Sequence, residues 1–313
     1  MEFLVVSGLN GVVHGLLLFM VSAGLTLIFG MMGVLNFAHA WFYMLGAYVG
    51  FTLSRTVGFW PGLIAAPLIA GGGGALVERY MLRRVHKYGH AHELLLTFGL
   101  AFIIEELIKL FYGDFPVSYV MPPYMKFAAF TLYETNYPFY RLFMGIVALV
   151  IFAALYVVLT RTRVGIIVRA ATHRPAMVEA LGHNLPVVFM SVFAAGAGLA
   201  GLAGAVAGAF FPTGPNMAVD FGTLVFVVVV VGGLGSLEGA LVASLMIGLF
   251  ISFSVGFNRS LADLLALVGL GPWAHEVGGL LTLQLSTIAA SMPFLLMLLV
   301  LLIRPAGLFG DRQ

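Results

Sequence analysis

The feature that most constrains this chain is a succession of long apolar runs, each close to the length that crosses a bilayer. A transmembrane helix needs roughly 20 apolar residues, whereas an outer-membrane barrel shows alternating segments of about ten. The runs predict an all-α integral membrane protein, a polytopic helical bundle of about eight to nine spans. The predicted spans lie near 9–29, 37–54, 59–77, 93–112, 141–160, 187–211, 221–234, 237–256 and 281–303.

Composition agrees with a chain that is solvated by lipid. Hydrophobic residues make up 61% and charged residues 9%, with a mean hydropathy of +1.07, whereas soluble domains carry about 25% charged residues. The 39 glycines suit a bundle whose helices approach closely. The chain has no cysteine, which excludes disulfides, thiolate metal sites and cysteine nucleophiles. We expect a single transmembrane domain over 1–313.

Two of the apolar runs are broken. Residues 27–48 (LIFGMMGVLNFAHAWFYMLGAY) contain glycines and the pair Asn36 and His39, and residues 230–248 contain a second break. Backbone polar groups in lipid need partners, so a broken segment must be buried in protein or line a cavity. Asparagine and histidine are costly at that depth and therefore are candidates for a transport path. The breaks predict a transporter subunit.

The two breaks correspond at an offset of 200 residues, which predicts an internal parallel repeat with halves at about 1–160 and 187–303. Asn36 and Ser236 are both good N-cap residues, so each is expected to start a half-helix. Glu238 then occupies a helix N-terminus, where negative charge is favoured. The alternative is that both residues are only caps and the glycines only packing contacts. The matching pairs are Gly33 with Gly233, Asn36 with Ser236, and Ala40 with Ala240.

The distribution of Lys and Arg predicts the orientation. The first segment, MEFLVVSGLNG, has no basic region, so we expect it to remain as a span rather than to be cleaved. Ten basic residues fall on one side and five on the other, which places the N-terminus outside and the C-terminus in the cytoplasm. The cytoplasmic set is Arg79, Arg83, Arg84, Lys87, Arg161, Arg163, Arg169, Arg174, Arg304 and Arg312; the outer set is Arg55, Lys109, Lys126, Arg141 and Arg259.

Six motifs in register resemble one known family, the LivH-type permease subunits of branched-chain amino acid ABC importers. Each motif alone is weak, but together they cover nearly the whole chain. They are NFAHAWFYMLGAY, ERYMLRRVHKYG (78–89), LLLTFGLAFIIEELIKLFYG (94–113), RVGIIVRAATHRPAMVEALGHN (163–184), GGLGSLEGA (232–240) and RPAGLFG (304–310).

The resemblance implies a subunit of the bacterial cytoplasmic (inner) membrane that forms half of a translocation path. Its implied partners are a second homologous permease subunit, two cytoplasmic ATPase subunits and an outer substrate-binding protein, with no cofactor and no nucleic acid. The sequence itself agrees that ATP is hydrolysed by other subunits. No GxxxxGK[ST] motif occurs, so the chain lacks this phosphate-binding loop. We expect a non-enzymatic subunit without catalytic residues, with ATP hydrolysis in other chains.

The predicted cytoplasmic loop 161–186 resembles the coupling element of ABC permeases, shortened here to Glu179-Ala180-Leu181-Gly182. Pro175 to Leu181 are expected to form a short amphipathic helix that Gly182 and Asn184 end. Such a plug would transmit closure of the ATPase as a rigid-body movement. An ordinary basic loop is the alternative. The residues expected to couple to the ATPase are Arg169, Arg174, Glu179, Ala180 and Gly182.

The expected path residues lie at the two breaks, and departures from the family pattern leave the cargo open. Where relatives commonly read Gly-Glu, this chain has Ala40 and Trp41, and it carries Glu238 where a small residue or proline is usual. Branched-chain amino acids, other amino acids, urea, short amides and aromatic or organic acids all stay in view. The path residues are Asn36, Phe37, His39, Trp41, Gly235, Ser236 and Glu238.

Two other classes of function, and three local features, complete the expectations. An ion-coupled secondary transporter would bind its ion at Glu105 or Glu238, and a membrane enzyme would use His39 as a base. Glu105 and Lys109 are expected to neutralise each other. The outer segments 113–140 and 257–280 are connectors or docking surfaces. A solvated loop, not a metal site, is expected at His86, His90, His92 and Glu93.

Overall fold

In the computed structural model, which describes residues 2–132, 135–256, 260–266 and 269–310, the protein is almost wholly helical. The predicted all-α membrane fold is confirmed. The longer helices are α1 (Glu2–Met32), α2 (His39–Thr56), α3 (Phe59–Val77), α5 (His90–Tyr112), α6 (Phe139–Arg161), α7 (Arg163–His173), α9 (Leu185–Gly208), α10 (Met217–Gly232), α11 (Leu237–Gly256) and α15 (Met292–Ile303). The shorter elements are α4 (Arg83–Val85), α8 (Pro175–Ala180), α12 (Leu261–Ala266), α13 (Gly271–Val277), α14 (Leu285–Ile288), β1 (Ala128–Leu132) and β2 (Thr135–Pro138).

Every predicted span corresponds to helical structure. Six helical segments in the described ranges are long and apolar enough to cross a membrane: Glu2–Met32, Phe59–Tyr88, Phe139–Arg161, Leu185–Gly208, Leu237–Gly256 and Leu285–Ile303. The other three predicted spans are α2, α5 and α10. Of these, α10 has only 16 residues, and α5 carries charged residues near both of its ends.

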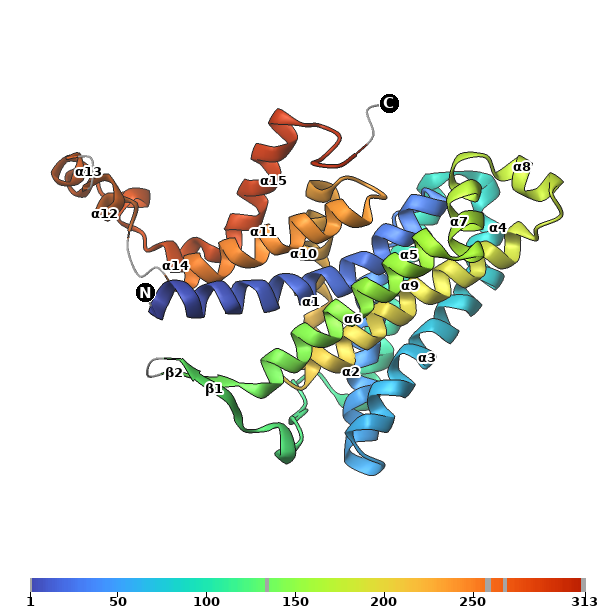
Figure 1. Cartoon of the computed structure of the whole chain (residues 1–313), viewed down its shortest axis with the longest axis horizontal. Helices are drawn as coiled ribbons and strands as arrows, with labels where there is room; N and C mark the ends of the chain where they lie inside the picture. The colour runs from blue at the N-terminus through green and yellow to red at the C-terminus, as the bar shows by residue number, and fades with distance from the viewer. Residues whose placement is uncertain (1, 133–134, 257–259, 267–268, 311–313) are drawn as a thin grey trace.

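Two helices, α1 and α9, form the centre of the bundle through close glycine contacts (Figure 1). A Cβ added to Gly24 of α1 would lie 2.5 Å from the carbonyl oxygen of Gly196 in α9. A Cβ added to Gly46 of α2 would lie 2.0 Å from the carbonyl oxygen of Gly201. On its other side α1 packs along α11, with Gly15 against the backbone of Ser244. Small residues thus set the helix spacing, as membrane packing favours.

The two ends of the bundle differ. At one end, which we call the basic end, α1 stops at Met32 and the helices α7 and α8 project (Figure 1). At the other, the hairpin end, α1 begins and the antiparallel strands β1 and β2 pair beside it. Helix α3 continues toward the basic end through a π-helical turn, Glu78–Leu82, then α4 and a 3₁₀ turn, His86–Tyr88.

The segment 113–138 is fixed to the bundle by hydrogen bonds. The Val117 amide donates to the Thr213 carbonyl at 2.8 Å, and the Tyr119 hydroxyl donates to the Ala205 carbonyl at 3.1 Å. The sequence did not predict the short β-hairpin, which closes this segment before α6. The second expected connector, 257–280, contains the short helices α12 and α13, while residues 257–259 and 267–268, and with them Arg259, lie outside the described residues, as does Arg312.

Candidate functional site

The two predicted breaks lie together at the basic end. The first is the non-helical segment 33–38 between α1 and α2, and the second is the turn 233–236 between α10 and α11. A Cβ added to Gly30, one turn before the first break, would lie 3.1 Å from the Cα atom of Gly235. Segments about 200 residues apart in sequence therefore meet at one place.

Hydrogen bonds order the second break on both sides. Gly233 and Gly235 have φ values of +102° and +85°, a conformation that L side chains rarely adopt. The Gly239 amide donates to the Ser236 hydroxyl at 3.0 Å, so Ser236 caps α11 as predicted. From the chain's end, the Leu308 amide donates to the Val231 carbonyl at 2.8 Å, and the Phe309 amide to the Gly232 carbonyl at 3.0 Å.

The prediction of a matching cap at Asn36 is wrong. Helix α2 begins at His39, its N-cap residue is Ala38, and no side chain caps it. Asn36 is fully buried, and neither its amide nitrogen nor its amide oxygen has a hydrogen-bond partner. The cap fails because two more residues, Phe37 and Ala38, turn before α2 starts, which places Asn36 two residues before the N-cap position.

The remaining path residues of the first break pack against different neighbours. His39 is 1% exposed and its Nε2 atom lies 2.9 Å from the Val21 carbonyl oxygen, inside the contact between α1 and α9. Phe37 lies between two rings, Phe226 of α10 at 4.9 Å and Phe98 of α5 at 6.1 Å between centroids. A base role for His39 would need access for a substrate, which this burial removes.

Trp41 lies beside the charged pair of α5. Its indole Nε1 donates to Glu105 Oε2 at 3.1 Å, and Lys109 Nζ lies 2.7 Å from the other oxygen of the same carboxylate. The predicted neutralisation of Glu105 by Lys109 is confirmed, and the indole is a second partner of the carboxylate. Glu105 is therefore satisfied within the chain.

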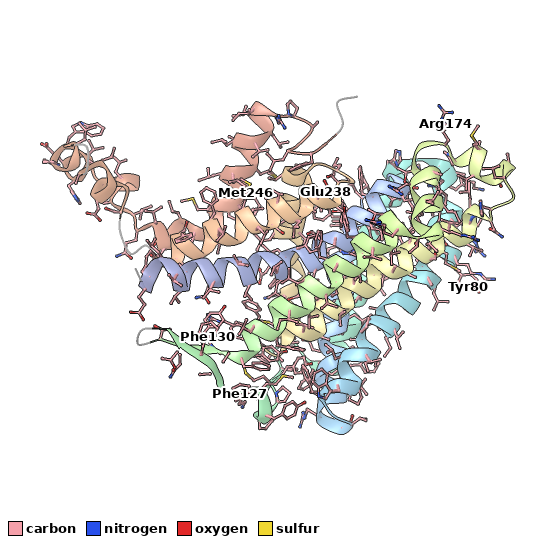
Figure 2. All side chains as sticks on the ribbon, in the orientation of Figure 1. Tyr80, Phe127, Phe130, Arg174, Glu238 and Met246 are labelled. Atoms are coloured by element: carbon pink, nitrogen blue, oxygen red, sulfur yellow. The ribbon has the colours of Figure 1, made fainter. Side chains whose placement is uncertain are left out.

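A cavity of about 370 Å³ at the basic end brings together residues from both predicted sets. Gly235, Ser236 and Glu238 of the second break line one wall, and Arg169 of α7 lines another. Figure 2 shows Glu238 near the start of α11. Sequence reasoning missed the polar side chains that join them from α1, α6 and α7, because no local pattern signals that these three helices meet here. These are Thr26, Tyr156, Thr160 and Thr172.

Helices α7 and α8 present the predicted coupling residues at the tip of the basic end, where Figure 2 labels Arg174. The expected short helix is present as α8, and Gly182 after it has φ +85°. Val178 is buried and packs with Ala171 and Leu185. The outward positions, by contrast, are exposed: Arg174, Met177, Glu179, Ala180 and Leu181.

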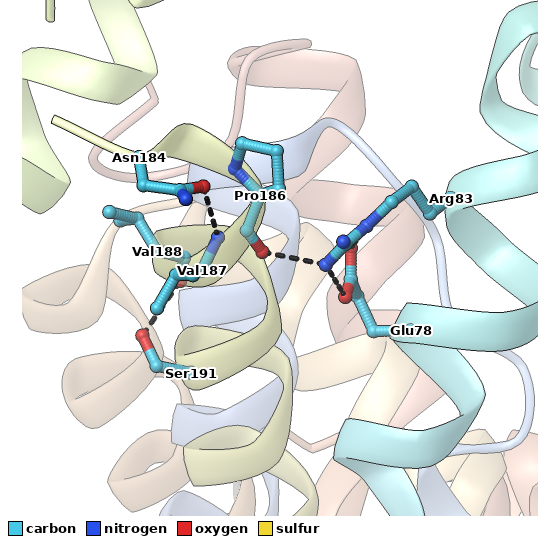
Figure 3. A network of polar contacts seen from close by, with 7 residues as sticks. All are labelled: Glu78, Arg83, Asn184, Pro186, Val187, Val188 and Ser191. Carbon is cyan, nitrogen blue, oxygen red and sulfur yellow. Dashed lines mark hydrogen bonds and ion pairs between the residues drawn. The ribbon is translucent and has the colours of Figure 1, made fainter. Parts of the chain in front are cut away.

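A polar network anchors this loop to the end of α3 (Figure 3). Arg83 Nη2 donates to Glu78 Oε2 at 2.7 Å and to the Pro186 carbonyl at 2.8 Å. Asn184 caps α9 by accepting from the Val187 amide at 3.3 Å. The π-helical turn places residues five apart on one face, which explains why sequence reasoning, which looked for spacings of three and four, missed the Glu78–Arg83 pair.

Comparison with known proteins identifies the family. A family model described as the branched-chain amino acid transport system permease component matches residues 7–301. The chain belongs to this family. The resemblance inferred from the six motifs is confirmed, and the protein is a multi-pass membrane permease component. No solved structure matches the chain significantly.

Curated permeases cover nearly the whole chain. The high-affinity branched-chain amino acid transport system permease protein LivH of Salmonella typhimurium is 26% identical, over 96% of this chain and 94% of the relative. LivH of Escherichia coli K12 gives the same values. BraD of Pseudomonas aeruginosa, a permease protein with the same description, is 23% identical over the same shares.

Proposed function

We propose that this chain is the permease subunit of an ATP-driven importer of branched-chain or closely related amino acids. The observation that carries the proposal is the continuous family match over 7–301. The names of the relatives, which describe branched-chain amino acid transport, indicate the cargo. The expected assembly has a second homologous permease subunit, two ATPase subunits and an outer binding protein. In that assembly the chain contributes half of the path and no catalysis.

The surface of α8 supports coupling to an ATPase. Met177 is 56% exposed and Leu181 is 73% exposed, and both lie beside the exposed carboxylate-bearing residue Glu179. The buried side of α8 is fixed to the bundle, because Val178 packs against neighbouring helices and Arg83 binds the Pro186 carbonyl at the start of α9. An apolar, rigid projection of this kind suits insertion into a cleft of a partner, so movement of the partner would be passed to α7 and α9.

Charge supports a cytoplasmic position of the basic end in a bacterial inner membrane, with the N-terminus outside. Arg79, Arg83, Arg84, Lys87 and Arg174 all belong to this end, and the positive-inside rule places such residues in the cytoplasm. The cavity lined by Glu238 and Arg169 then opens on the cytoplasmic side and is the proposed exit of the path. Phe37 and Trp41 are only partly buried between α2, α5 and α10, where a second subunit can cover them.

Reconstitution tests the function. The chain would be co-expressed with a homologous second permease and two ATPase subunits from the same organism, placed in liposomes with ATP inside, and given labelled leucine with a binding protein outside. We expect ATP-dependent uptake that valine and isoleucine compete away and that urea and benzoate leave unchanged. Liposomes with this chain alone should show no uptake. Gradient-driven uptake by the chain alone would instead establish a secondary transporter.

A further inference from the structure

A second cavity lies at the hairpin end, apart from the proposed path residues. It measures about 290 Å³ and is bounded by the first turns of α1 and α6, the last turns of α11 and the two phenylalanines that follow α9. Figure 1 shows the starts of α1 and α6 and the end of α11 in the same part of the molecule. The volume is at the lower limit of small-molecule sites.

A guanidinium without a carboxylate partner lines this cavity. Arg141 donates from Nη1 to the Asn10 side-chain oxygen and lies over the Phe210 ring, 5.0 Å from its centroid. Among the described residues no carboxylate lies within ion-pair distance of Arg141. Asparagine and the ring fix the plane of the guanidinium and leave most of its five N–H donors for a planar oxyanion.

A second polar residue, His14, lines the same cavity. Its Nε2 atom is buried without a hydrogen-bond partner. The Phe211 ring packs edge-on against the imidazole at 6.0 Å and holds it in place. The Ser252 hydroxyl, by contrast, donates to the Ser7 carbonyl at 2.7 Å and is already used. Buried polar atoms without partners are uncommon in folded proteins, and this one belongs to a residue of the cavity wall.

The remaining walls are apolar. Val13 and Leu17 of α1, Met144 of α6, and Ile251 and Val255 of α11 supply them. The cavity thus pairs one fixed cation with an aliphatic lining, a combination that selects an oxyanion joined to a short apolar body. A free aliphatic carboxylic acid has this chemistry, and so does an anionic lipid.

We propose that this cavity binds a free aliphatic carboxylic acid or amino acid, with its carboxylate on Arg141 and its aliphatic part against α1 and α11. The proposal rests on the proposed function, because it makes the cavity a site within this subunit for the cargo that function implies. Its position at the end opposite α8 makes it a site for cargo before, not after, passage through the bundle.

Protection of a single cysteine tests the proposal directly, since the chain has no native cysteine. Val255 lines the cavity and is 59% exposed, so Val255→Cys reports occupancy without touching a polar group. The full chain would be placed in nanodiscs of neutral phosphatidylcholine and labelled with a small thiol reagent. We expect L-leucine and 4-methylpentanoate to slow labelling at least about threefold, and 3-methylbutylamine, which lacks the carboxylate, to have no effect.

Matched variants assign the effect to Arg141. Adding Arg141→Gln should raise the protecting concentration of leucine at least about tenfold, because a charge-assisted hydrogen bond is lost, and Arg141→Lys should restore part of it. Arg55 is the control: it also lies at the hairpin end, 5.5 Å from the Phe51 ring centroid, but outside the cavity, so Arg55→Gln should change nothing. A cysteine at exposed Val57 should not be protected.

Three outcomes would overturn the proposal: no protection at saturating leucine, equal protection by the amine, or equal effects of Arg55→Gln and Arg141→Gln. A second set of nanodiscs would contain phosphatidylglycerol, an anionic lipid. If labelling of the cysteine is already slow in these nanodiscs without any added acid, and leucine does not slow it further, the cavity binds a lipid headgroup. Uptake by the assembled importer separates this test from the proposed function. Normal uptake without protection of the cysteine would refute the proposed binding site alone. Protection of the cysteine without uptake would refute the proposed function alone.

Discussion

At the scale of single residues, Asn36 and Ser236 correspond in the sequence but differ in position and surroundings, because Ser236 directly precedes α11 and Asn36 lies three residues before the start of α2. The Ser236 hydroxyl oxygen accepts the capping hydrogen bond from the Gly239 amide, whereas the side-chain amide of Asn36 is buried with both polar atoms unpaired. Leaving a buried polar group unpaired costs about 1–3 kcal/mol. We therefore expect Asn36 to gain a partner in the assembled importer, from the second subunit or from cargo, while Ser236 works within this chain.

Single cysteines at positions 36, 37, 39 and 236 test this difference. In the chain alone, cysteines replacing fully buried Asn36 and His39 should not react with a small polar thiol reagent, while those replacing Phe37 and Ser236, which are partly exposed, should react. In the assembled importer with ATP and cargo, we expect position 36 to become reactive as the path opens. If it stays unreactive in every state of a transporting complex, Asn36 is a packing residue and the path runs elsewhere.

Ser236→Ala should lower the free energy of unfolding by about 1 kcal/mol, because the cap on Gly239 is lost. Unfolding in mixed detergent, followed by circular dichroism, measures the change. Ser191→Ala is the matched control, since its hydroxyl donates to the Val188 carbonyl within α9 and caps no helix. That variant should remain within about 0.5 kcal/mol of the native chain, and equal losses in both would contradict a capping role.

At the scale of elements, the basic end depends on one irregular turn. The π-helical turn Glu78–Leu82 places the Glu78 carboxylate, which is 1% exposed, against Arg83, and the same arginine reaches the Pro186 carbonyl at the start of α9. Two elements about 100 residues apart are thereby joined next to α8. In the proposed coupling, movement of α8 would therefore be passed to α3 as well as to α9.

Arg83→Met should lower the free energy of unfolding by about 3 kcal/mol, because removing one partner leaves a buried carboxylate uncompensated. It should also weaken the stimulation of ATPase activity by cargo in the assembled importer. The neighbouring Arg84 is exposed and has no ion pair within the described residues, so Arg84→Met should change neither quantity. Equal effects of the two variants would show that the loss of a positive charge, and not the loss of the Glu78–Arg83 contact, causes the change.

Gly182→Val should uncouple the importer while leaving membrane insertion intact. Gly182 has φ +85°, a conformation that costs a β-branched residue more than 1 kcal/mol, so the end of α8 would rearrange. Glu179→Lys should act similarly through charge. Gly89→Val is the control for strain alone, since Gly89 has φ +96° and open space around it but lies outside the loop. ATPase stimulation by cargo is the measurement, and unchanged stimulation in both loop variants would place the contact elsewhere in 161–186.

At the scale of the whole molecule, the positions of the helices followed from the sequence and the contacts between distant residues did not. Apolar length located the helices because lipid enforces it. The cap at Ser236 was predictable from local chemistry, whereas the burial of Asn36 depends on tertiary packing and was not. The hairpin-end cavity combines residues such as Asn10 and Arg141 from separate helices, and no local pattern signals that meeting. The internal repeat stays a prediction.

The proposed orientation gives a prediction for the intact cell. Lys126, which follows α5, and Arg174, beside α8, are both exposed basic residues at opposite ends of the bundle. A membrane-impermeant thiol reagent should label Lys126→Cys in intact cells and Arg174→Cys only after the membrane is opened, because the basic end is cytoplasmic. The reverse pattern would invert the topology, and with it the proposed side of ATPase docking.

The π-helical turn also affects how relatives of this chain should be compared. Such a turn contains one residue more than regular α-helix would use over the same rise. If the same residues formed plain α-helix, Glu78 and Arg83 would lie about 140° apart around the helix axis. The arginine would then point away from the glutamate even if every side chain were the same. The anchor seen in Figure 3 therefore depends on backbone geometry, and a count of identical residues would not register its loss.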